Sequence, residues 1–230
     1  MDWLPDDFFS GHTAPTTPSD NRPLSQGDIF TDVRVAGRTA VDKNGHWTAS
    51  IKNENVIAVA SSCGMRKAGG ALNDVVHVAP IKELVKVAPK WGPPWAGWLH
   101  ILPLPHLEIG GKGELGANLG RIGLCGADQL TPQNRLASVS LEGMKALKTR
   151  LAEYFTRTEI PVDTAGVGAH EEWWEISLWE RWVEATGTHD GYQDWLDAEN
   201  PNYSPRTRRE TLYDDLVGIR NQLDEQCAQP

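Results

Sequence analysis

The chain reads QGDIF at residues 26–30, VIAVA at 56–60 and VVHVAPI at 75–81, and the order of these three apolar segments decides its fold. A Gly-Asp turn opens the first segment, small polar residues follow the second, and the third carries a proline near its end. Short apolar strands separated by such turns are typical of a small, strongly bent β-barrel. The sequence therefore predicts a barrel, and no complete catalytic or metal-binding motif accompanies it.

The β-rich pattern extends from Leu24 to about Leu136 and includes a hairpin arm at 33–51 and a further strand at 99–104. The glycine-rich stretch 110–116 lacks the Gly-Lys-Ser/Thr ending of a phosphate-binding loop, so we interpret it as a hairpin or a flexible loop. Apolar residues at three-to-four spacing then predict a helix that begins at Ser140, a suitable N-cap.

Residues 170–226 carry helical patterns throughout. A Trp-rich helix is predicted to begin at Glu171 and to end at Gly187, preceded by a linker at 166–169. A short helix follows at 192–198. A third helix, capped at Ser204-Pro205, carries an apolar seam that needs a partner surface, most simply the Trp-rich helix; the seam consists of Leu212, Leu216, Ile219 and Leu223.

These patterns predict an α+β fold in which a small SH3-like β-barrel with a packed helix is followed by an α-helical C-terminal appendage. We divide the chain into an extended Pro-rich arm over residues 1–23, the barrel plus helix over 24–160, and an acidic Trp-rich helical region over 161–230.

The net charge of −9 is unevenly distributed, because residues 161–230 hold 5 basic and 15 acidic side chains while the preceding residues are nearly neutral. The acidic region would repel nucleic acid, although the barrel could still approach it, and a protein partner suits the acidic region better. No apolar run approaches the roughly 20 residues of a membrane span. The first residues lack the pattern of a secretory signal, so we expect a cytoplasmic protein or a phage particle assembled in the cytoplasm.

The cysteines and histidines do not fall into a metal-binding or disulfide pattern. Cys63, Cys125 and Cys227 are widely separated, and His77 on an apolar strand is typical of a core histidine. Cys63 follows a buried strand at a turn of small residues, so a reactive thiol at this position is an alternative interpretation. We therefore expect no metal and no cofactor.

Large aromatic residues outside the barrel indicate partner binding. Trp3, Phe8 and Phe9 lie on the Pro-rich arm and must dock either on the same chain or on a neighbour. Together with the indoles of the helical region, they exceed what one small helical lobe needs. The candidate partner-binding residues are Trp3, Phe8, Phe9, Trp173, Trp174, Trp179 and Trp195.

Trp91, Trp95 and Trp98 lie among glycines and prolines and belong to a loop. The loop either covers one end of the barrel or forms a stacking platform for bases or sugars.

The barrel segment with its following helix, about residues 24–157, resembles the plasmid-maintenance toxins of the MazF/PemK type, which are small SH3-like barrels. The matching segments are Gly27 to Phe30, Val56 to Ala60, Val76 to Ile81, Ala117 to Ile122 and Arg135-Leu136. The segment also resembles bacterial and phage proteins with a Gly-Asp-Ile-Phe opening and a Ser-x-x-Cys turn.

In the ribonuclease members, the resemblance implies a basic residue after the first strand and a Thr or Ser directly after the Ala-Pro-Ile strand. Arg34 or Arg38 could take the first role, while Lys82-Glu83 occupies the second position. A glutamate there opposes the binding of a phosphate anion.

Two functional hypotheses follow. The first is a non-enzymatic protein–protein interaction or assembly component of a phage or mobile element, such as a virion or connector component. Its partners would be other proteins or further copies of the chain in a homo-oligomer. The alternative is a MazF-like endoribonuclease or nucleic-acid-binding toxin that uses Arg34, Arg38 and Lys82 with the Trp91, Trp95 and Trp98 loop.

Overall fold

The computed structural model describes most of the barrel and the C-terminal helices. The described residues are 7–9, 22–41, 43–44, 47–67, 72–84, 100–111, 113–156, 162–212 and 214–228, without the side chains of 38–41, 47–49, 62–63 and 162–172. Trp3, Trp91, Trp95 and Trp98 lie outside these residues, and so do the side chains of Arg38 and Cys63.

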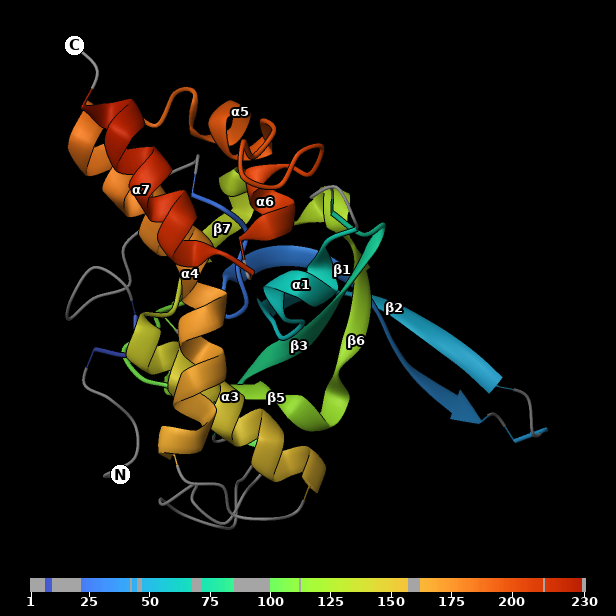
Figure 1. Ribbon diagram of the computed structural model, residues 1–230. Helices are drawn as coiled ribbons and strands as arrows, with labels where there is room; N and C mark the ends of the chain where they lie inside the picture. The colour runs from blue at the N-terminus through green and yellow to red at the C-terminus, as the bar shows by residue number, and fades with distance from the viewer. Residues whose placement is uncertain are drawn as a thin grey trace.

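Four antiparallel strands close into a small barrel (Figure 1): β1 pairs with β2 and β6, and β3 pairs with the same two strands. Their bounds are Ile29–Val41 for β1, Trp47–Ala58 for β2, Val75–Glu83 for β3 and Gly123–Gly126 for β6. The predicted α+β barrel fold is confirmed. The two long strands, β1 and β2, form a ribbon that projects from the body in Figure 1.

Three shorter strands complete the sheet: β4 (Ile101–Leu104), β5 (Leu115–Asn118) and β7 (Arg135–Ala137). β4 and β5 pair with each other, so that residues 110–116 belong to a hairpin, the first of the two alternatives for this stretch, and β5 also pairs with the end of β3 at 81–83. β7 pairs with the start of β1. The short helix α1 (Ser62–Met65) follows β2.

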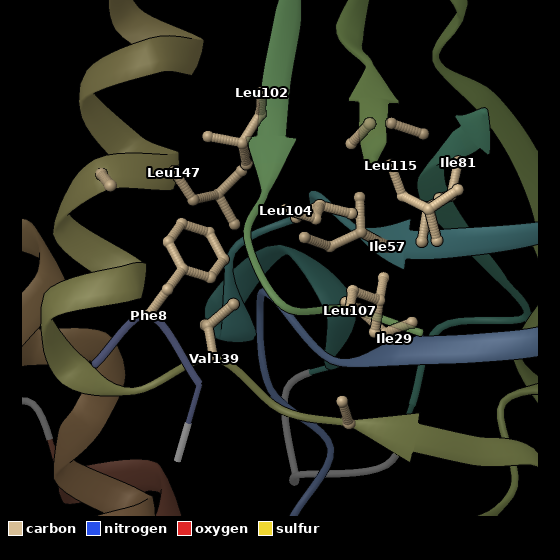
Figure 2. Close-up of a cluster of buried hydrophobic side chains, with 14 of the residues drawn as sticks. Phe8, Ile29, Ile57, Ile81, Leu102, Leu104, Leu107, Leu115, Val139 and Leu147 are labelled. Carbon is tan, nitrogen blue, oxygen red and sulfur yellow. The ribbon is translucent and has the colours of Figure 1, made fainter. Parts of the chain in front are cut away.

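Two apolar clusters hold the barrel. One fills its interior with side chains such as Phe30, Val56, Val76 and Val78. The other lies between the barrel end and helix α3 (Leu141–Thr156), where Ile57 faces Leu104 and Leu147 lies beside Leu102 (Figure 2). The helix begins as predicted, because the Ser140 hydroxyl oxygen accepts a hydrogen bond from the Gly143 N–H at 3.0 Å.

The turn that precedes β1 consists of Gly27 and Asp28 and requires glycine at its first position. Gly27 has a φ of 87°, and a Cβ there would lie 2.2 Å from Val139 Cγ2, so both conformation and space require glycine. The neighbouring Asp28 is buried, and one of its oxygens accepts a hydrogen bond from the Ser25 N–H at 3.0 Å. The turn therefore fixes where β1 enters the barrel.

Asp28 also connects segments that are far apart in the sequence. Its carboxylate accepts a hydrogen bond from the Ser138 hydroxyl at 2.5 Å and lies 3.4 Å from the Arg22 guanidinium and 3.6 Å from that of Arg135. All four side chains are buried. This network joins the segment before β1 to the junction between β7 and α3.

The C-terminal region is helical, with α4 (Val162–Thr186), α5 (Tyr192–Asp197), α6 (Arg208–Thr211) and α7 (Leu216–Cys227). The linker predicted at 166–169 is wrong, because these residues belong to α4, which packs along α3. Packing between the two helices outweighs the low helix propensity of the glycines at this point. Gly187 ends α4 with a φ of 69°, as expected.

The predicted third helix is interrupted at residues 212–215, because Asp215 caps a new helix by accepting a hydrogen bond from the Gly218 N–H at 2.9 Å. The seam still packs as predicted. Leu212, Ile219 and Leu223 are buried against Leu178 and Trp182 of α4.

A buried ionic network attaches this helical region to the barrel. Glu175 of α4 accepts hydrogen bonds from Arg209 of α6 at 2.5 Å and from Arg66, just after α1, at 3.3 Å. Burial lowers the pKa of the Arg209 guanidinium, but Glu175 and Asp197 outweigh that effect and hold it above its usual value. The described helices include none that is both long and apolar enough to span a bilayer.

Candidate functional site

Two aromatic residues of the N-terminal arm, Phe8 and Phe9, belong to the protein's own core. Phe8 and Phe9 are 1% and 4% exposed and belong to the apolar cluster beneath α3. Figure 2 shows Phe8 between Leu147 and Val139. Phe9 forms an antiparallel bridge with Val139, and the Phe8 carbonyl accepts a hydrogen bond from the Ser140 N–H at 2.9 Å. Phe8 and Phe9 therefore dock on their own chain, the first of the two alternatives given for them, and are buried.

The indoles of the helical region also pack within the chain. Trp195 is buried against Trp182, with ring centroids 5.8 Å apart, and Trp179 stacks on His189 at 6.3 Å. Trp173 packs on the core below α3, and the Arg22 guanidinium lies 5.4 Å from its ring centroid.

Trp174 is half-buried. Among Trp173, Trp174, Trp179 and Trp195, none has the high exposure that a free docking residue would show. Their spacing in the sequence could not reveal this, because burial depends on how α4 and α5 fold back against each other.

A polar cleft of about 530 Å³ lies where β2 and β3 separate. The two strands pair only as far as Val56 and Pro80, after which β3 turns to pair with β5. Aliphatic side chains form one part of the lining and polar side chains the rest; the lining consists of Thr31, Asp32, Asn53, Glu54, Asn55, Ile81, Lys82, Glu83, Ile109 and Leu115.

Carboxylates outnumber cations in this polar cleft. Asp32, Glu54 and Glu83 contribute three carboxylates, and Lys82 contributes the one ammonium group in the lining. Lys82 Nζ donates a short hydrogen bond to Glu54 Oε2, so its charge is already paired. The polar cleft therefore favours a cation over a phosphate.

Asp32 is held in an unusual conformation at the polar cleft. It has a φ of 54° and lies in a bulge of β1, where the pairing with β2 shifts between Phe30 and Val33. Asn53 Nδ2 donates to Asp32 Oδ1 at 2.7 Å, and Asn55 Oδ1 accepts from the Asp32 N–H at 3.3 Å. These contacts fix the carboxylate beside the opening between the strands.

The candidate catalytic residues are not brought together as a phosphate site. Lys82 lines the polar cleft, whereas Arg34 is an exposed residue of β1 that is absent from its lining. The side chain of Arg38 lies outside the described residues. Sequence reasoning located Lys82 but missed Glu54, because their proximity depends on the separation of two strands that lie far apart along the chain.

A second surface feature is a row of exposed residues across the outside of the barrel. Ile51, Ala36, Leu124 and His77 lie on four neighbouring strands and are connected by successive cross-strand pairs. Directly paired residues project to the same face, and Val75, two residues before His77, shares it. We call these five residues the outer row.

The outer row concentrates exposed apolar surface. Ile51 is 61% exposed, Val75 53% and Leu124 39%. Among the described residues, only three other large apolar side chains have comparable exposure, and they lie on helices or loops: Phe155, Tyr203 and Val217. The sequence alone gave no signal for this surface, because the pairing between β1 and β6 was not predicted.

The described residues offer no obvious alternative centre for chemistry. Cys125 is buried in the barrel, and burial, with a smaller effect from Asp128, raises the pKa of its thiol to about 11. No group of three His, Cys, Asp or Glu side chains in the described part of the chain is arranged to hold a metal ion.

Comparison with known families found no family model that matches the chain, and no curated protein matches it. The polar cleft and the outer row are therefore the observations on which a functional proposal must rest.

Proposed function

We propose that this protein is a non-enzymatic interaction component that docks another protein on its outer row. The observation that carries the proposal is that the exposed side chains of Ile51, Leu124 and Val75 lie on the same outward side of neighbouring paired strands. Burying such a side chain completely contributes about 1.5–3 kcal/mol, so a partner that covers all three gains substantial apolar binding energy. Clustered exposed apolar residues of this kind are characteristic of protein interfaces.

The chemistry of the surface favours a different protein over a second copy or nucleic acid. The chain carries a net charge of −9, which opposes self-association and the approach of a polyanion. The resemblance of part of the sequence to plasmid toxins is what supports a phage or mobile-element setting, such as a virion or connector component assembled in the cytoplasm.

Site-specific photocrosslinking in the producing cell tests this proposal. A photoreactive residue at Leu124 should crosslink to one discrete protein, whereas the same residue at Val217, which is 70% exposed on α7, should not. Leu124→Asp should weaken the association about tenfold or more, because it places a charge in an apolar contact. Absence of a specific product at Leu124, or a product formed only with a second copy of the chain, would overturn the proposal.

The toxin-like ribonuclease has less support, because the polar cleft places three carboxylates where a phosphate would bind. We expect mixed single-stranded RNA to remain uncleaved during incubation with the purified protein, and Lys82→Ala to leave that result unchanged. Gel analysis of the RNA measures this directly. Cleavage that disappears in Lys82→Ala would replace the interaction proposal with the enzymatic one.

A further inference from the structure

One edge of β2 has no strand partner over much of its length. β2 pairs with β1 from Trp47 to Ile57, interrupted at the bulge opposite Asn55, but it pairs with β3 only at Val56, Ile57 and Ala58. Toward the tip of the ribbon, the described residues provide no second strand for β2. An open strand edge of this kind is a template for an added strand.

The direction of the backbone groups on this edge follows from the hydrogen bonds at its base. The Val59 N–H donates to His77 of β3 at 3.0 Å, whereas the Ala58 N–H donates to Asp28 on the β1 side at 2.9 Å. N–H groups alternate in direction along a strand, and the extra residues at both register shifts lie in β1. The N–H groups of Asn55, Asn53 and Ile51 therefore point away from β1.

The corresponding edge of β1 is covered near the barrel. The Arg34 N–H donates to Gln129 Oε1 at 2.8 Å, and Asn134 Nδ2 donates to the Thr31 carbonyl at 3.2 Å. These backbone groups of β1 already form hydrogen bonds with side chains, so they are not available to pair with another strand. The open edge of β2 differs, because its exposed side chains at Ile51 and Asn53 leave it accessible.

The polar cleft lies at the base of this open edge. Asn53, Glu54 and Asn55 of β2 form one of its sides, and Ile81 to Glu83 of β3 form another. An extended segment lying along β2 would therefore place one of its side chains at the polar cleft.

We propose that an extended segment of the partner adds to the open edge of β2 and inserts an arginine or lysine side chain into the polar cleft. This inference rests on the proposed function and specifies the partner's chemistry. The excess of carboxylates over cations in the lining suits the cationic head, and Ile81, Ile109 and Leu115 suit the aliphatic stem of a long basic side chain.

Selection from a random displayed-peptide library tests this inference with the full-length protein. The selected peptides should contain an Arg or Lys within a β-prone sequence. Binding should protect the N–H groups of Asn53 and Asn55 from hydrogen exchange. Ile51→Pro removes one edge N–H and should abolish binding, whereas Ile51→Val keeps both that N–H and an apolar side chain in the outer row and should retain binding.

The charge of the polar cleft is tested separately with Asp32→Asn. Asparagine tolerates the positive φ of this position and can still accept the hydrogen bond from Asn53. A selected Arg peptide should bind about tenfold more weakly to this variant, while its Arg→Gln derivative should bind both proteins equally. Asp74→Asn, which removes a carboxylate at the opposite end of β3, is the matched control and should have little effect.

The outcomes separate this inference from the proposed function. Peptides that bind the β2 edge without preference for a basic residue would overturn the inference. Failure to select any peptide while Leu124 still crosslinks to a partner would also overturn the inference and leave the outer row as the docking surface. Loss of both the peptide binding and the Leu124 crosslink would overturn both.

Discussion

Replacing Asp28 by alanine is expected to lower the free energy of unfolding by about 3–5 kcal/mol, as is typical when one partner of a buried ionic network is removed. The guanidinium groups of Arg22 and Arg135 would remain buried without their carboxylate. Burial already lowers the pKa of Arg22 even with Asp28 beside it. Removing Asp28 would take away the main attraction that offsets the cost of burying the Arg22 charge. The Ser138 hydroxyl would also lose its acceptor.

Chemical denaturation of Asp28→Ala, Asp28→Asn and the wild type measures the effect. Asp28→Asn keeps an oxygen that can accept hydrogen bonds, so it should be destabilised less than the alanine variant. Asp74→Ala is the control, because the Lys67–Asp74 pair is exposed to solvent and its loss should change stability little. If Asp28→Ala lowers the free energy of unfolding no more than Asp74→Ala does, the buried ionic network around Asp28 does not stabilise the fold.

The Asp28 network also shows how far sequence reasoning reaches in this fold. The segment QGDIF predicted a turn that opens an apolar strand, and Gly27 and Asp28 form that turn. Local residue types carry this signal, because glycine permits the positive φ of the turn and an Asp side chain accepts hydrogen bonds from nearby backbone N–H groups. The partners at Arg135 and Ser138 are more than a hundred residues away, so no local pattern could identify them.

The same distinction explains the errors in the helical region and at the candidate site. The glycines near residue 166 resemble a linker locally, but packing of α4 along α3 keeps them helical. Trp195 resembles a docking residue in the sequence, but Trp182 and Tyr192 cover it. The outer row and the polar cleft could not be predicted, because both depend on which strands pair and where that pairing ends.

Phe8→Ala is expected to lower the free energy of unfolding by about 3–5 kcal/mol, the usual cost of deleting a buried phenylalanine side chain. Phe8 is 1% exposed and packs with Val139, Leu102 and Leu147 (Figure 2). Phe155→Ala is the matched control, because Phe155 is 66% exposed and its loss should change stability by less than about 0.5 kcal/mol. Equal unfolding midpoints for the two variants would show that the arm contributes nothing to the fold.

Gly143→Ala tests the docking of the arm from the opposite side of the contact. In an isolated helix this substitution would stabilise by about 1 kcal/mol. Here the added Cβ would lie 2.1 Å from the Phe8 carbonyl oxygen, so the backbone of the arm would have to move away from α3. The Phe8 side chain sits on that backbone, and its displacement should cost more than the gain in helix propensity. We therefore expect Gly143→Ala to lower the unfolding midpoint, whereas a raised midpoint would indicate that the arm does not occupy this site.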